Sequence, residues 1–124
     1  HPTTFRDAVA DLVDSTLGTT AKLVFRLSGT AGSPGTAVTT LAFGNPAFGA
    51  SSSGVITANA ITSDTNATGN ASPVANATLE TGGGTVVVHC AVAASASDIN
   101  MTGGLTIGAG DTVACSSLTY TAMP

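Results

Sequence analysis

The chain has 124 residues and a formal net charge of −4, and only 8% of its residues are Asp, Glu, Lys or Arg, whereas a typical soluble domain has about a quarter. Because charged side chains supply most general acids, general bases, metal ligands and phosphate-binding groups, this composition argues against an enzyme and against a metal or cofactor site. The three basic residues are too few for direct binding to nucleic acid or to an anionic membrane surface.

A chain of this length fits one domain with one core. We therefore expect residues 1–124 to form a single domain, with an N-terminal arm and helix in residues 1–18 and a β domain in residues 19–124. No apolar run approaches the roughly 20 residues that span a bilayer. The N-terminus lacks the pattern of a signal peptide, and the start at His1 leaves open whether a leader has been removed.

Residues 4–17 have the periodicity of an amphipathic helix, in which one face is apolar and the opposite face is acidic. The apolar face consists of Phe5, Val9, Leu12, Val13 and Thr16. The acidic face consists of Asp7, Asp11 and Asp14. We expect Thr3 or Thr4 to cap the start of the helix and Gly18 to follow its end. The three aspartates are expected to form a solvated face rather than a cation site.

After Gly18 the pattern changes to the period of two that is typical of strands. Residues 22–27 alternate, with Leu23 and Phe25 on the inner side and Lys22 and Arg26 on the outer side. Further strands are expected at residues 38–43, 54–60, 73–79, 85–92 and 112–121, with short ones at 99–101 and 105–107.

Clusters of Gly, Ser, Asn and Pro separate these segments, as turns do. We therefore expect a mainly β fold, an antiparallel β-sandwich or barrel of the jelly-roll kind, with one short N-terminal amphipathic helix. Residues 112–121 have apolar side chains on both faces. We expect this strand to lie centrally in the sheet, either buried on both sides or with a bulge at Ser116 and Ser117.

Cys90 and Cys115 are the only cysteines. Both lie in apolar, strand-like segments, so they form either one disulfide or two buried thiols. Free thiols are favoured, because small domains that depend on disulfides usually contain more cysteines. Neither cysteine has a neighbouring Lys or Arg that would favour a thiolate, so no nucleophile is expected.

His89 lies in the apolar segment VVVHCAV, and the other histidine is terminal. A structural zinc site needs four N or S ligands, and adjacent strand residues such as His89 and Cys90 point to opposite faces. We therefore expect His89 to be a structural residue. The acids that follow the helix all adjoin turns, where such residues are ordinary surface groups: Asp64, Glu80, Asp98 and Asp111.

Phe43, Pro46 and Phe48 surround an Asn-Pro corner. Proline fixes its own φ and moves the preceding Asn45 out of the helical region. The two rings either pack under their own loop, which is favoured, or face outward as an aromatic contact for a partner. Under the second alternative, these three residues are the candidate partner-binding site.

Three segments are distinctive: DAVADLVD at residues 7–14, LAFGNPAFGASSSGVITANAITSD at 41–64 and GDTVACSSLT at 110–119. In these segments the chain resembles a family of small structural proteins encoded in the virion gene clusters of tailed bacteriophages and prophages. Members of that family open with a similar helix, carry L-x-F-x-x-P-A-F-G followed by G-V-x-T-A-N-x-I-T-S-D, and end in a G-D-T-V-x-x-x-S-L-T strand. The resemblance spans nearly the whole chain and brings no catalytic residue with it.

The resemblance implies a capsid decoration or cement protein that binds the lattice of the major capsid protein, copies of itself, or both, as a trimer or dimer. Such a protein would pass from the host cytoplasm to the outer capsid surface. The acidic charge suits that surface, because a part that faces packaged DNA would need basic residues. One alternative is a structural protein of the tail or neck. An alternative from another class is an extracellular carbohydrate-binding or adhesive module, for which Tyr120 is the candidate aromatic platform.

Overall fold

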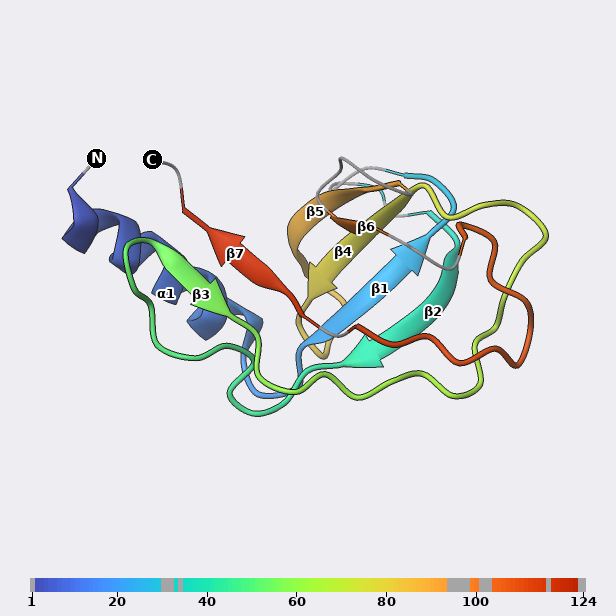
Figure 1. Cartoon of the computed structure of the whole chain (residues 1–124), viewed down its shortest axis with the longest axis horizontal. Coiled ribbons are helices and arrows are strands. Elements are labelled where there is room, and N and C mark those ends of the chain that lie inside the picture. The colour runs from blue at the N-terminus through green and yellow to red at the C-terminus, as the bar shows by residue number, and fades with distance from the viewer. Residues whose placement is uncertain are drawn as a thin grey trace.

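Helix α1 (Thr3–Leu17) lies at one end of an elongated molecule, and the larger of two β-sheets lies at the other end (Figure 1). The structure is a computed structural model that describes residues 2–29, 33, 35–93, 99–100, 104–115 and 117–122. Within these residues the larger sheet has five strands and the smaller sheet has two.

The arrangement of the strands confirms a mainly β fold with one N-terminal helix. The larger sheet consists of β1 (Lys22–Arg26), β2 (Ala37–Ala42), β4 (Asn76–Glu80), β5 (Val86–Ala93) and β6 (Ile99–Asn100). The smaller sheet consists of β3 (Val55–Thr57) and β7 (Thr119–Thr121). The order in the larger sheet is β2-β1-β4-β5-β6, and the pairings among the described strands are antiparallel except for β5 with β6. Neither sheet closes into a barrel, so the fold is sandwich-like.

One face of the larger sheet is apolar because the side chains of β1 alternate in the expected way. Leu23 and Phe25 point to this face, and Leu23 pairs with Leu41 of β2 on one side and with Leu79 of β4 on the other. All four side chains are buried. This face needs a second layer to cover it, since exposed apolar area of that extent is unfavourable.

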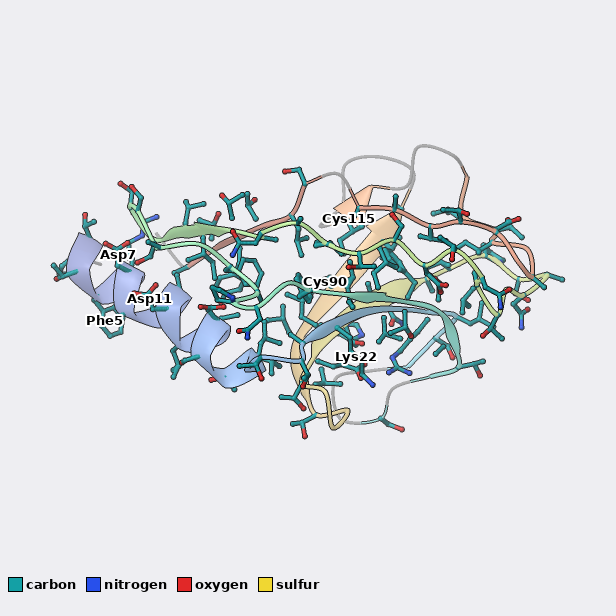
Figure 2. All side chains as sticks on the ribbon, turned by 90° about the horizontal axis from the view of Figure 1, so that it is seen from below. Phe5, Asp7, Asp11, Lys22, Cys90 and Cys115 are labelled. Carbon is teal, nitrogen blue, oxygen red and sulfur yellow. The ribbon has the colours of Figure 1, made fainter. Side chains whose placement is uncertain are left out.

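The second layer is an irregular antiparallel ribbon, which we define as residues 55–74 paired with residues 105–121. Its ladder starts at β3 and β7 and continues along the molecule through backbone hydrogen bonds from Ala58 to Leu118 (2.8 Å), Asn70 to Ile107 (2.8 Å) and Val74 to Leu105 (2.8 Å), in each case from the N–H to the carbonyl oxygen. Figure 2 shows the ribbon running along one side of the larger sheet. The ribbon places four buried side chains in the same core cluster as Leu23 and Phe25: Ile56, Ala67, Val74 and Ile107.

The ribbon also closes the outer edge of β2. The Thr62 N–H donates to the Ala42 carbonyl at 2.8 Å, and the Gly69 N–H donates to the Val38 carbonyl at 3.1 Å. The two segments of the ribbon approach closely at Gly69, where an added Cβ would lie 2.3 Å from the Ala109 nitrogen. The larger sheet therefore continues past β2 into the ribbon, which folds back over the apolar face.

Two strand predictions near the C-terminus are wrong. Residues 105–107 form no strand, although the Leu105 and Ile107 carbonyls accept hydrogen bonds from the other segment of the ribbon, residues 55–74. Only Thr119–Thr121 of the expected strand at 112–121 is β7, and this strand pairs with β3 instead of lying centrally in the larger sheet. Val113 forms an isolated bridge with Asp64 in the ribbon and is not part of the larger sheet. Ser116, Met101 and Asp98 lie outside the described residues.

The start of α1 also differs from the prediction. The Pro2 carbonyl accepts hydrogen bonds from the N–H groups of Phe5 and Arg6, each at 3.1 Å, so Pro2 is the N-cap and Thr3 is already helical. No side chain caps the helix. At the other end, the prediction is confirmed, because Gly18 has φ of 78° and its N–H donates to the Asp14 carbonyl at 3.3 Å.

The faces of α1 are turned relative to the expected arrangement. Ala10 and Leu17 are buried, whereas Leu12 is 63% exposed and Phe5 is 49% exposed. Asp7 and Asp14 are not a solvated face. Each carboxylate accepts a hydrogen bond from a backbone N–H of the segment that leads into β3. Such N–H groups need an acceptor when they lose contact with water, and Asp7 and Asp14 supply it.

Those two contacts are specific. Asp7 Oδ1 accepts from the Gly54 N–H at 2.7 Å, and Asp14 Oδ1 accepts from the Phe48 N–H at 3.1 Å. Asp11, the third aspartate of the helix, is exposed. Two of the three aspartates that were expected to form a solvated face, Asp7 and Asp14, therefore bind the helix to the rest of the fold.

We predict that Asp14→Ala lowers the free energy of unfolding by about 1–3 kcal/mol, because it removes a charged acceptor from a backbone N–H. Asp11→Ala is the matched control on the same helix and should change stability by less than about 0.5 kcal/mol. Urea unfolding followed by circular dichroism measures both. Equal effects of the two substitutions would contradict the role assigned to Asp14.

Candidate functional site

The candidate partner-binding residues at the Asn-Pro corner mostly face inward. Phe48 is 1% exposed and Phe43 is 7% exposed, with their ring centroids 5.6 Å apart and the ring planes tilted by 34°. The Asn45-Pro46 peptide bond is cis, and the Asn59 side-chain amide donates to the Pro46 carbonyl at 2.9 Å. The two rings thus pack inward, which is the alternative favoured from the sequence. Pro46 alone of the three predicted residues is exposed.

Cys90 and Cys115 are free thiols in the structure, as favoured from the sequence, and both are half-buried. Burial raises the pKa of the Cys115 thiol, and a backbone interaction with Ser117 opposes that shift in part. The thiol also donates to the Ser117 carbonyl at 3.4 Å. Cys115 lines an open depression of about 300 Å³ beside Ile61 and Leu118. A thiol held in its protonated form is a poor nucleophile, so the depression has no reactive group of that kind.

His89 is exposed on β5, opposite Thr78 of β4. The described part of the chain contains no group of three or more His, Cys, Asp or Glu side chains that could hold a metal ion. The Asp111 carboxylate accepts a hydrogen bond from the Gly108 N–H at 2.8 Å, within its own turn.

The Arg26 and Glu80 side chains form a buried ion pair on the polar face of the larger sheet, where the sequence suggests an outward Arg and a surface Glu. Arg26 Nη2 contacts Glu80 Oε2, and their side chains are 13% and 2% exposed. The Thr78 hydroxyl donates to the same carboxylate oxygen, and Arg26 Nη1 donates to the Gly35 carbonyl at 2.7 Å. The pair thus joins β1 to β4 and both to the connection between β1 and β2. Asn76 Oδ1, also buried on this face, has no hydrogen-bond partner among the described residues.

No local pattern in the sequence predicts this pair. Arg26 and Glu80 are far apart in the chain and meet only when β1 pairs with β4. Their charges neutralise each other inside the fold, where an unpaired charge would be costly.

Asp64 joins the ribbon to the edge of β2. Its Oδ2 accepts from the Thr39 hydroxyl at 2.5 Å and from the Thr40 N–H at 3.2 Å, and its Oδ1 accepts from the Asn66 N–H at 3.0 Å. The Thr39 hydrogen bond, followed by that of Asn66, holds the pKa of Asp64 below its usual value of 3.8, while burial opposes the shift.

The exposed apolar surface of the described residues lies on α1. Phe5 and Leu12 are the large hydrophobic side chains that are exposed there. They belong to a row along the helix that we call the α1 seam, which consists of Phe5, Val9, Leu12 and Thr16. Figure 2 shows Phe5 on the side of α1 that faces away from β3 and β7, whereas Asp7 lies on the side toward them. Val9 of this row is partly buried and packs against the core.

Comparison with protein-family models, with curated proteins and with solved structures finds no match to this chain. None of the helices in the described residues has the length and apolar character that crossing a membrane would require.

We predict that stability falls as the pH drops through the lowered pKa of Asp64. This carboxylate is stabilising at pH values above 3.8, its usual pKa, because there the unfolded chain also carries the charge. Below the lowered pKa the folded form takes up a proton and the contribution is lost. The stability difference between wild type and Asp64→Asn should therefore be largest near neutral pH and shrink in acid.

Urea unfolding over a series of pH values measures that difference. Thr39→Val serves as the matched variant, because it removes the donor that contributes most to the shift and should flatten the same part of the profile. A stability difference that stays constant at every pH would contradict the role of the carboxylate.

Proposed function

We propose that this protein is a structural component of the virion of a tailed bacteriophage, and specifically a capsid decoration or cement protein. It binds the lattice of the major capsid protein on the outer surface of the shell and stabilises the shell against the pressure of packaged DNA. The proposal starts from the resemblance of residues 7–14, 41–64 and 110–119 to small proteins of phage virion gene clusters. In the fold, the first segment lies in α1, the second contains the Asn-Pro corner and β3, and the third is part of the ribbon.

The observation that carries the proposal is the use made of the charged side chains. Arg26 and Glu80 neutralise each other, and Asp7, Asp14 and Asp64 accept hydrogen bonds from backbone N–H groups. These five side chains stabilise the fold, so they are not available for acid, base or metal chemistry. Such a chain is suited to a role in which shape and contact matter and no reaction takes place.

Binding to a lattice suits a small protein with limited contact area. A stable complex buries on the order of 800 Å² per partner, and many copies that contact a shell and one another act together through their effective concentration. We include self-association in the proposal, as a dimer or trimer. The net charge of −4 favours the outer surface, because DNA inside the shell would repel the protein.

The carbohydrate-binding alternative loses support because Tyr120 is only partly exposed. Sugar rings usually stack on an open aromatic face, and a half-buried Tyr on a short strand offers little of one. Location in the tail or neck is the alternative within the virion, and copy number distinguishes it from the shell.

Co-sedimentation with emptied capsids of the phage tests the proposal. We predict that the purified protein binds capsids saturably, at a fixed ratio to the major capsid protein, and raises the temperature at which the shells come apart. Purified tails of the same phage are the control. Binding to tails in place of capsids would support the tail alternative, and binding to neither would contradict a virion role.

A further inference from the structure

We draw no further inference here: the strongest candidate, the exposed surface patch around Leu12 on the outer side of helix α1, carries no proposal, because nothing in the structure shows what covers it.

Discussion

Backbone hydrogen bonds between the two segments of the ribbon are the interaction on which the rest of this fold depends. With aromatic residues at 4% of the chain and no Trp, the core contains few large side chains and gains limited stability from burial alone. The ribbon compensates, because its ladder pairs backbone groups that would otherwise be buried without partners. It also contributes Ile56, Val74 and Ile107 to the same core cluster as Leu23 and Phe25. Since the ribbon starts at β3 and β7, it joins the helical end of the molecule to the sheet end.

The few charged groups fasten the elements to this framework. Asp14 binds α1 to the Asn-Pro corner, and Asp64 binds the ribbon to β2. The ion pair of Arg26 with Glu80 joins β1 to β4. These side chains are therefore engaged in contacts within the fold. The hydrogen bonds of Asp7 and Asp14 fix which side of α1 faces the rest of the fold.

Local patterns in the sequence predicted the elements whose residues are neighbours in the chain. The positions of α1, β1, β2 and β5 follow from periodicity, and the inward packing of Phe43 and Phe48 follows from the Asn-Pro corner. The orientation of α1 could not be predicted, since it depends on N–H groups of Phe48 and Gly54 that are distant in sequence. The ribbon has no strict period of two, so its two segments could not be recognised as partners before the fold brought them together. The pairing of Arg26 with Glu80 escaped prediction for the same reason.

Amide hydrogen exchange followed by NMR tests the central role of the ribbon most directly. The N–H groups of Ala67, Asn70 and Val74 donate to carbonyls of the other segment, at 3.0, 2.8 and 2.8 Å. If the ribbon holds the second layer, these amides are protected to a similar degree as those in β1 and β4, because all of them are released only when the fold opens. Exchange of the three amides at the rate of an unstructured peptide, while β1 and β4 stay protected, would contradict this account.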